Sequence, residues 1–461
     1  MAPLTIAQAS CADDYDPDSM PVAKAREFIH RFLQPLSGTL RVPIRSALGR
    51  VLAEDVLSPV DVPAHRNSAM DGWAMRGADL RTDGETTLTE IGASFAGRPF
   101  AGSVGPGQCV RIMTGGVVPA GADTVVMQER AKATGKSVTF PAGQKAGQNV
   151  REAGEDLGKG SIALRRGRIV RPADLGLIAS LGIGEVAVYR PLRVAFFSTG
   201  DELKGVGTAL GEGEIYDSNR YTLFGMLERL GCDVLDMGVV RDEPELLERA
   251  FAEAAANADV VITSGGVSVG EADFVKAMLD RLGEVVFWKI AMKPGRPLAY
   301  GRIKGAHFFG LPGNPVSVMV TFYQFVRDAL LALSGANPVE PVPTFNATCT
   351  ARLKKAPGRT EFQRGILTRG PGGALTVRPT GEQGSGILKS MSEANCFIIL
   401  GDATGNVEPG TSVEVQLLEG LVCAPRRHRS PARASSISGR LVAGGLPAGP
   451  LRGPVPHGTP G

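Results

Sequence analysis

The sequence predicts a multidomain α/β protein in which a wound α/β domain is joined to smaller, β-rich domains. Between residues 192 and 335, short apolar runs alternate with segments that carry apolar residues at helical spacing, the pattern of a wound parallel sheet. Residues 88–128 and 344–422 instead contain several short β runs separated by Gly and Pro. The chain of 461 residues is long enough for two to four domains.

Composition and charge argue against several classes of protein. No apolar run reaches membrane-spanning length, and the acidic N-terminus lacks a signal pattern. The six cysteines are scattered without a CxxC pair, so we expect no zinc site, no disulfide framework and a cytoplasmic location. The net charge is +3, but residues 424–461 hold six Arg and no acid, which leaves −3 for the rest and argues against nucleic acid as the main partner.

Six regions follow from these patterns. An amphipathic helix is predicted to begin at Val22, and a second, short helix is expected around Ser46–Glu54. The regions are a disordered N-terminus (1–20), a helix and linking α/β region (21–65 and 157–191), a small β domain (66–156), the wound α/β domain (192–340), a small β barrel or sandwich (341–423) and a disordered Arg/Pro/Gly-rich tail (424–461).

The wound domain contains clear strand and helix signals. Polar residues precede its helices, and Asp217, Asp242 and Asn314 are predicted to cap them. The expected strands are Val194–Ser198, Val234–Val240, Ala258–Thr263 and Val285–Ile290, followed by a hairpin of Leu298–Ile303 with His307–Phe309.

The segment from Ala258 to Asp273 carries the strongest functional signal of the chain. A buried strand is followed by a loop of small residues, including Gly265, Gly266 and Ser268, and then by a helix. This layout presents backbone N–H groups to an anion, and nearby acids such as Asp273 suggest a metal ion between acid and anion. The alternative is a packing loop with a capping Asp.

Ligands bind outside the carboxyl ends of the strands in a wound sheet. We therefore expect one rim of the sheet to gather both acids and bases. The segments concerned are Asp201–Glu202, Asp242, Ser264–Asp273, Lys289–Arg296 and Pro312–Pro315.

Ten motifs, in order, match a known family. The chain resembles the molybdopterin molybdenumtransferases, which also occur as the C-terminal domain of gephyrin, over roughly residues 20–422. The motifs are SAMDGWA (68–74), RIMTG (111–115), PAGAD (119–123), REAGED (151–156), STGDEL (198–203), GEIYDSN (213–219), TSGGVSVGEAD (263–273), FWKIAMKPGRP (287–297), LPGNP (311–315) and TFYQF (321–325).

The resemblance implies insertion of molybdenum from molybdate into adenylylated molybdopterin, with AMP release, a requirement for Mg²⁺ and molybdenum cofactor as product. It implies a four-domain homodimer with a terminal barrel, in which the β domain of the partner subunit completes the cleft of the α/β domain. The adenylyltransferase and molybdoenzyme apoproteins are further partners that this function suggests.

The resemblance also implies roles for particular residues. Magnesium suits Glu202, Asp242 and Asp273, because Mg²⁺ prefers carboxylates together with substrate phosphates. The cations Lys289, Lys293 and Arg296 suit molybdate and pyrophosphate. Other matching positions are Asp71, Thr114, Arg151 and Asp156 on the β domain, Gly265, Gly266, Ser268, Pro312 and Pro315 on the α/β domain, and Ser385 on the terminal domain.

Most of these residues also have a structural interpretation. Asp242, Asp273 and Glu202 could accept hydrogen bonds from backbone N–H groups, as a helix cap does. Asp71 could fix a turn, and Lys289 could be an edge-strand surface lysine. His65 and His307 have no partner pattern. Three positions depart from the family: Arg66 where Asp is frequent, Trp73 where Tyr is frequent, and Arg296 where Lys is frequent.

Two other functions remain open from the sequence. One is a molybdopterin adenylyltransferase, which uses a similar α/β module. The other is a non-catalytic molybdopterin-binding scaffold. The small β domain, the SAMDG motif and the terminal domain favour the molybdenum-inserting enzyme over the first, and the set of acids and lysines favours it over the second.

Overall fold

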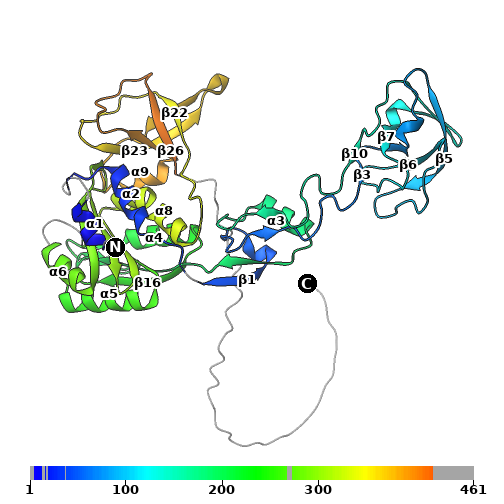
Figure 1. Ribbon diagram of the computed structural model, residues 1–461. Coiled ribbons are helices and arrows are strands. Elements are labelled where there is room, and N and C mark those ends of the chain that lie inside the picture. Colours follow the sequence, from blue (N-terminus) through cyan, green and yellow to red (C-terminus); the bar gives the residue numbers. More distant parts are fainter. Residues whose placement is uncertain (1–4, 13–15, 17–18, 37, 267–271, 419–461) are drawn as a thin grey trace, which may run out of the picture. The chain divides into compact units, whose positions relative to one another are not determined.

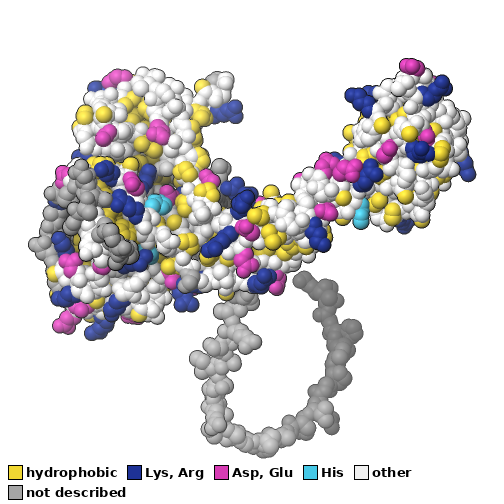
Figure 2. Space-filling model, viewed as in Figure 1, with side chains coloured by type: hydrophobic (Ala, Val, Ile, Leu, Met, Phe, Trp, Pro, Cys, Tyr) yellow, Lys and Arg dark blue, Asp and Glu magenta, His cyan; other side chains and the backbone are white. Residues whose placement is uncertain are grey.

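The computed structural model describes residues 5–12, 16, 19–36, 38–266 and 272–418 (Figure 1). The predicted tail (424–461) and Ser268 lie outside the described residues. On the face shown in Figure 2, Lys and Arg side chains lie interspersed with Asp and Glu side chains.

A six-stranded mixed sheet forms the centre of the α/β domain, in the order β16-β13-β17-β21-β20-β18. The first four strands of this order pair in parallel with their neighbours. Strand β20 runs antiparallel to β21, and β18 runs antiparallel to β20. The predicted wound sheet and its hairpin are thus confirmed. The strands are β13 (Arg193–Thr199), β16 (Asp233–Val240), β17 (Val260–Ser264), β18 (Gly283–Lys289), β20 (Pro297–Ile303) and β21 (Ala306–Leu311).

Both faces of this sheet are covered by helices, which explains why its strands are apolar without alternation. Along β13, Val194 and Phe196 enter one hydrophobic core, while Ala195 and Phe197 enter the other. The second core contains residues of α5 and α6, which lie together in Figure 1. The helices are α4 (Ser218–Arg229), α5 (Pro244–Asn257), α6 (Ala272–Leu282), α7 (Pro315–Thr321) and α8 (Arg327–Leu333), with a π-helical turn (Phe322–Val326) between the last two.

One continuous helical segment, Pro315–Leu333, is long and apolar enough to cross a membrane by length and composition alone. It lies mostly inside the core, however, with 67% of it buried. Val316, Val318 and Phe325 belong to the same cluster as the strands of the sheet. The apolar character of this helix is therefore explained by its position in the core.

The N-terminal segment differs from the predicted disorder. Residues Ile6–Ala12 form helix α1, and Val22–Arg31 form the predicted amphipathic helix α2. Ile6 is 3% exposed, and its backbone N–H donates to Glu284 Oε2 on β18 at 3.1 Å. The burial of Ile6 and Ala9 against the core stabilises a helix too short to persist alone.

The linking region also contains one departure from the sequence. The helix expected around Ser46–Glu54 is only a 3₁₀ turn, Ile44–Ala47, because Val51 and Leu52 instead form β-bridges with Ile169 and Val188. Pro172 begins helix α3, a position where a proline fits because its missing N–H needs no partner. The remaining elements are β1 (Thr39–Pro43), β2 (Val56–Leu57), β11 (Ile162–Leu164), α3 (Pro172–Ser180) and β12 (Glu185–Tyr189).

The small β domain contains a six-stranded sheet in the order β7-β4-β6-β5-β9-β8. Each face packs on its own apolar cluster, one around Trp73 and Phe140 and the other around Val110 and Ile112. The strands are β3 (Asn67–Ser68), β4 (Gly72–Met75), β5 (Thr86–Ser94), β6 (Gln108–Ile112), β7 (Thr124–Met127), β8 (Lys132–Thr134), β9 (Ser137–Phe140) and β10 (Val150–Arg151), with 3₁₀ turns at Gly77–Asp79 and Gln128–Arg130.

The C-terminal domain is a closed barrel, which settles the choice between barrel and sandwich. Strand β23 pairs with both β24 and β25, so the order β23-β24-β22-β26-β25 closes on itself. Its elements are β22 (Thr344–Cys349), β23 (Thr360–Arg369), β24 (Leu375–Pro379), α9 (Leu388–Glu393), β25 (Cys396–Leu400) and β26 (Ser412–Leu417), with a 3₁₀ turn at Pro371–Gly373.

We expect His307 to contribute to acid sensitivity. Its ring is 1% exposed, stacks on Tyr300 with centroids 6.4 Å apart, and has no hydrogen-bond partner at Nδ1. Burial lowers the pKa of His307 to about 4, from an ordinary value near 6.5. Between these pH values the unfolded chain binds a proton that the folded chain does not, so the free energy of unfolding falls as the pH falls, by up to about 3 kcal/mol.

The variant His307→Phe keeps an aromatic ring beside Tyr300 and should lose less stability than the native chain between pH 6.5 and 4. Urea unfolding followed across this pH range measures the difference. His65→Phe, on an exposed loop, is the matched control. Identical acid slopes for the native chain and His307→Phe would contradict the prediction.

Candidate functional site

The candidate site lies at the carboxyl ends of the parallel strands β16, β13, β17 and β21. Parallel pairing aligns these ends, because Ser198 of β13 lies opposite Ser264 of β17, which in turn lies opposite Leu311 of β21. The loops that leave the four strands therefore begin side by side. Each of the segments that the sequence placed at this rim is attached to one of these ends or to the β18–β20 region next to them.

Two glycines allow the loop after β17 to cross the end of β13 in close contact. Gly265 and Gly266 have φ angles of +94° and +68°. A Cβ atom at Gly265 would lie 2.5 Å from the carbonyl oxygen of Thr199, and one at Gly266 would lie 2.9 Å from the Thr199 hydroxyl. The backbone N–H of Gly265 donates to Leu311 O at 3.1 Å. Only glycine fits this approach without displacing β13.

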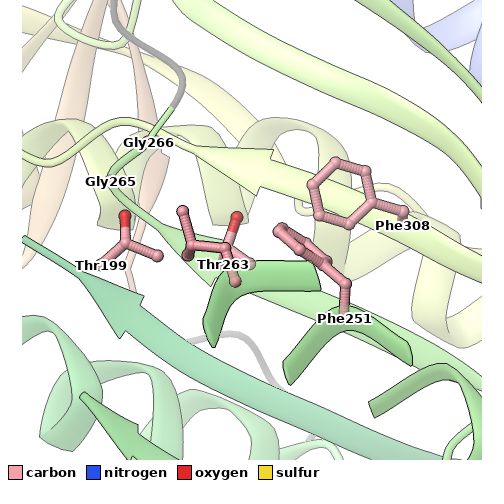
Figure 3. A pocket seen from close by; sticks show the side chains of 7 residues that line it. Thr199, Phe251, Thr263, Gly265, Gly266 and Phe308 are labelled. Atoms are coloured by element: carbon pink, nitrogen blue, oxygen red, sulfur yellow. The ribbon is translucent and has the colours of Figure 1, made fainter. Parts of the chain in front are cut away.

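A pocket opens beside these glycines, between the strand ends and helix α5 (Figure 3). Figure 3 shows Phe251 and Phe308 on one side and Thr199 on the other, with Thr263 between them. The Thr199 hydroxyl is buried without a hydrogen-bond partner. The lining residues are Thr199, Leu247, Phe251, Thr263, Gly265, Gly266 and Phe308.

Two of the predicted acids stand on loops that are in contact, and the third lies at the start of a helix. Glu202 is exposed, and its carboxylate lies back over Gly200, where a Cβ would be 2.6 Å from Oε2. The backbone N–H of Asp242 donates to Asp201 Oδ1 at 3.4 Å, so the loops after β13 and β16 are in contact. Asp273 lies in the first turn of α6. Within the part of the chain that the structure describes, no three Asp, Glu, His or Cys side chains are grouped to hold a metal ion.

Asp242 does not cap α5, contrary to the sequence-based expectation. The N-cap is Glu243, and its side chain makes no capping hydrogen bond. Pro244 at the first helical position already removes one N–H that a cap would otherwise serve. The structural interpretation of Asp242 as a helix cap is therefore wrong.

Two polar residues at this rim, Asp217 and Asn219, were not among the predicted site residues. Asp217 does cap α4 through the N–H of Arg220, and its Oδ1 also accepts from Ser198 Oγ at 2.9 Å. The carboxylate is almost fully buried, yet Oδ2 has no hydrogen-bond partner and lies 3.8 Å from Arg220 Nε. Such an oxygen can accept a hydrogen bond or bind a cation.

Asn219 of α4 connects the end of β17 with the loop after β21 through one side chain. Its Nδ2 donates to Ser264 Oγ at 2.7 Å and to Gly313 O at 2.6 Å, while Oδ1 is buried without a partner. The sequence does contain a signal for these two residues. A helix start needs one capping side chain, and here two polar residues, Asp217 and Asn219, stand two positions apart, so one of them is free for another role.

The LPGNP loop connects the α/β domain with the barrel. Pro312 is buried, and Pro315 occupies the first position of α7, with Asn314 as a cap that lacks a side-chain hydrogen bond. The N–H of Val316 donates to the backbone carbonyl of Ser385 at 3.0 Å. The predicted barrel residue Ser385 is therefore brought to the rim of the α/β domain.

Arg364, which the sequence did not single out, organises the loop that carries Ser385. It is 1% exposed, and its guanidinium donates to Gly384 O at 2.9 Å and to Ser390 Oγ at 3.0 Å. Its backbone N–H also donates to Gln383 Oε1 at 2.7 Å. Burial lowers the pKa of Arg364 to about 10, which leaves it a cation at neutral pH.

The predicted basic residues occupy the segment between β18 and β20. Lys289 ends β18, where it is half-buried, and its carbonyl accepts from Met20 N at 3.1 Å. Lys293 belongs to the short strand β19 (Met292–Lys293), which pairs with the barrel. Arg296 is exposed, and its carbonyl accepts from Ile290 N at 2.6 Å.

The predicted β-domain residues form a second group. Asp71 Oδ1 accepts from Thr114 N at 2.7 Å and from Thr114 Oγ1 at 2.8 Å, and these bonds lower the pKa of Asp71 below its usual value. Arg151 lies in β10 and Asp156 is exposed on the loop after it. The predicted site residues that the structure describes thus fall into two groups, one at the rim of the α/β domain, where Ser385 of the barrel joins it, and one on the small β domain.

Two of the three residues that depart from the family pattern, Arg66 and Trp73, have defined side-chain partners here. Arg66 Nε lies 3.1 Å from Glu152 Oε1, an exposed ion pair. The indole N–H of Trp73 donates to Glu90 Oε2 at 2.7 Å, and the Arg111 guanidinium lies over the Trp73 ring, 4.4 Å from its centroid. The positive charge of Arg66 therefore balances the negative charge of Glu152, which belongs to the 151–156 segment.

Comparison with known proteins agrees with these observations. Three family models match: the MoeA N-terminal region (domain I and II) at residues 20–182, a probable molybdopterin binding domain at 195–332 and the MoeA C-terminal region (domain IV) at 346–418. The chain is 47% identical to the molybdopterin molybdenumtransferase of Haemophilus influenzae over 82% of its own length and 94% of the relative's. It is 36% identical to molybdopterin molybdenumtransferase 2 of Mycobacterium tuberculosis, over the same shares of both chains.

A solved structure shows the same fold. The chain resembles the crystal structure of the molybdopterin biosynthesis moeA protein from Pyrococcus horikoshii OT3, with a TM-score of 0.75 and 29% identity. The match covers 87% of this chain and 100% of that chain. The similarity therefore extends over all the domains of that relative.

We predict that Gly265→Ala destabilises the chain and closes the pocket. The positive φ alone costs about 1–2 kcal/mol for a residue with a Cβ atom, and the 2.5 Å approach to Thr199 O adds to this cost. Chemical unfolding measures the loss. Gly225→Ala is the matched control, because Gly225 lies within α4 with no atom within 4 Å of the added methyl, and should stabilise by up to about 1 kcal/mol. Equal effects at the two positions would contradict the role assigned to Gly265.

Proposed function

Since the chain belongs to the MoeA family of molybdopterin molybdenumtransferases, and so has a role in molybdenum cofactor biosynthesis, we propose that it inserts molybdenum from molybdate into adenylylated molybdopterin and releases AMP. The observation that carries this proposal is the rim of the α/β sheet. There two glycines border a pocket with the unpartnered hydroxyl of Thr199, and carboxylates and basic residues stand on neighbouring segments of the same rim.

Binding of the substrate falls to the loop after β17 and to the buried polar atoms beside it. The N–H of Gly265 is used by Leu311 O, whereas the backbone of Gly266, which carries no side chain, is the part of the loop that a phosphate can approach closely. The unpartnered oxygens of Thr199 and Asn219 provide hydrogen-bonding positions for a polar ligand next to this loop.

The basic residues act on the anionic groups of both substrates. Molybdate and the pyrophosphate are oxyanions, and Lys289, Lys293 and Arg296 follow one another along the segment between β18 and β20. Cleavage of the pyrophosphate leaves negative charge on the phosphate of AMP. A cation held at that position stabilises the developing charge.

The donor chemistry at the rim fits Mg²⁺. Magnesium takes oxygen ligands and commonly needs only one or two carboxylates in addition to substrate phosphates. Glu202 and Asp242 stand on loops that are in contact through the bond between Asp242 N and Asp201 Oδ1. These two acids and Asp273 would hold the ion, which when bound would neutralise charge on the phosphate oxygens.

A second subunit supplies the β-domain residues in this proposal. The small β domain has its own apolar clusters, and its Asp71–Thr114 pair lies on an exposed edge of the domain. An ionised Asp71 that is fixed by two hydrogen bonds is suited to orient a donor group of a substrate. The homodimer therefore joins the two groups of site residues, with Ser385 brought to the rim by the barrel.

Removal of a rim carboxylate should impair pyrophosphate cleavage far more than folding. We expect Asp273→Ala and Glu202→Gln each to lower molybdate-dependent AMP release by ~10²-fold or more, the scale for loss of one main electrostatic stabiliser. Stability should change by only about 1 kcal/mol. Loss of negative charge beside an anion should favour retention of the adenylylated substrate.

Glu248→Gln is the control. Glu248 lies on α5, and this substitution removes only the acid of its exposed ion pair with Arg281 of α6. Bound nucleotide is measured by chromatography after denaturation, and stability by thermal unfolding. Normal turnover by a destabilised Asp273→Ala would show that Asp273 has only a structural role.

The dimer is tested by light scattering at micromolar concentration. We expect a mass near twice that of the 48.3 kDa chain, because the proposed site needs residues from two subunits. A mixture of Asp71→Ala and Asp273→Ala chains should then recover part of the activity, since one of the two mixed sites keeps both native residues. A mass near that of one chain, with full activity, would contradict the dimer.

A further inference from the structure

Lys293, one of the basic residues at the rim, is paired with a buried acid of the barrel domain. Its Nζ atom lies 3.4 Å from Glu361 Oε1. The Lys293 side chain is 50% exposed, whereas that of Glu361 is only 7% exposed. The acid is therefore the fixed member of the pair, and the lysine is the member that a ligand can reach.

The backbone fixes this pairing. Strand β19 is an added parallel strand of the barrel sheet, in which Met292 lies opposite Thr360 and Lys293 lies opposite Glu361. The N–H of Thr360 donates to Ala291 O at 3.0 Å. The lysine-bearing strand of the α/β domain is thus aligned by the barrel, residue by residue.

The same segment is held from the other side by helix α7. Gly295 has a φ of +97° and packs so closely on this helix that a Cβ would lie 2.6 Å from Thr321 Oγ1. Little room is therefore left for the backbone next to Lys293 to shift. What remains variable at Lys293 is the direction of its long side chain, and the Glu361 carboxylate sets that direction.

Glu361 is itself held in one orientation. Its second oxygen, Oε2, accepts from Gln363 Nε2 at 2.9 Å. Gln363 is 5% exposed, and its Nε2 also donates to Lys354 O at 2.9 Å. Burial of a carboxylate is costly unless it is paired and hydrogen-bonded, and here both oxygens have a partner.

We infer that Glu361 is a positioning residue for the transfer reaction, because it holds the Lys293 ammonium at the rim where the oxyanion binds. This inference rests on the proposed function, in which Lys293 contacts molybdate or the pyrophosphate. It gives the barrel domain a part in anion binding that is separate from the Ser385 loop. A purely structural ion pair between two domains would contribute stability but would not act through Lys293.

A double-mutant cycle separates these two roles. The variants are Glu361→Gln, Lys293→Met and the combination of both, assayed for molybdate-dependent AMP release and for thermal unfolding. We expect Glu361→Gln to lower kcat/KM for molybdate by roughly 10-fold or more, because the ammonium loses its fixed position. In the Lys293→Met background, the same substitution should change kcat/KM by less than about 2-fold, because there is no ammonium left to position.

Thermal unfolding gives a readout that does not depend on the reaction. Lys293→Met leaves a buried carboxylate without a cation and should lower the Tm, and Glu361→Gln added to it should restore much of the loss. Glu408→Gln is the matched control, because it removes the acid of an exposed ion pair with Arg352 in the same barrel. If Glu361→Gln fails to fold, Glu361→Asp, which keeps the charge and shortens the side chain, takes its place in the cycle.

The outcomes are distinct. Impaired Lys293→Met together with fully active Glu361→Gln would overturn the inference and leave the proposed function intact. Losses that multiply in the double variant would also overturn it, because Glu361 would then act independently of Lys293. Absence of AMP release by the native chain, with both substrates and Mg²⁺ present, would overturn the proposed function and this inference with it.

Discussion

Parallel pairing of β13 with β17 is the interaction on which the rest of the α/β domain depends. The pairing places Phe196 opposite Ile262 and Ser198 opposite Ser264, so both strands end at the same level. Their apolar side chains fill a core on each face of the sheet. Because the strands end together, the loop after β17 has to pass the carbonyl of Thr199, and the glycine at 265 makes that contact possible. The pocket and the buried oxygens of Asp217 and Asn219 follow from this one alignment.

The barrel contributes two buried charged residues that contact the rim of the α/β domain or the loop beside it. Strand β23 carries Glu361, which faces Lys293, and Arg364, which holds the carbonyl of Gly384 next to Ser385. Both are buried charged residues on one strand, and each makes hydrogen bonds that define a neighbouring segment. A buried charge is expensive, so its presence indicates a requirement for a fixed geometry more than a gain in stability. In this chain the two geometries concerned are those of a basic residue and a loop at the rim.

The small β domain is organised differently, because its candidate residues are fixed by local contacts. Asp71 and Thr114 stand at adjoining strand ends, since Gly72 lies opposite Ile112 in the β4–β6 pair. Two hydrogen bonds to one carboxylate oxygen hold Asp71 in its charged form. The exposed Arg66–Glu152 ion pair is separate from that local unit.

The sequence by itself determined the order of domains, the wound sheet and the rim residues, because apolar period, glycine placement and motif order are local properties of the chain. It also located the Asp217 cap of α4. Tertiary structure alone decided three other features. Burial against β18 made Ile6–Ala12 helical, bridges at Val51 and Leu52 replaced a predicted helix, and strand β19 joined the barrel sheet, which brought Glu361 to Lys293. Each of these depends on contacts between residues far apart in the chain, and the free energy of such contacts cannot be deduced from local propensity.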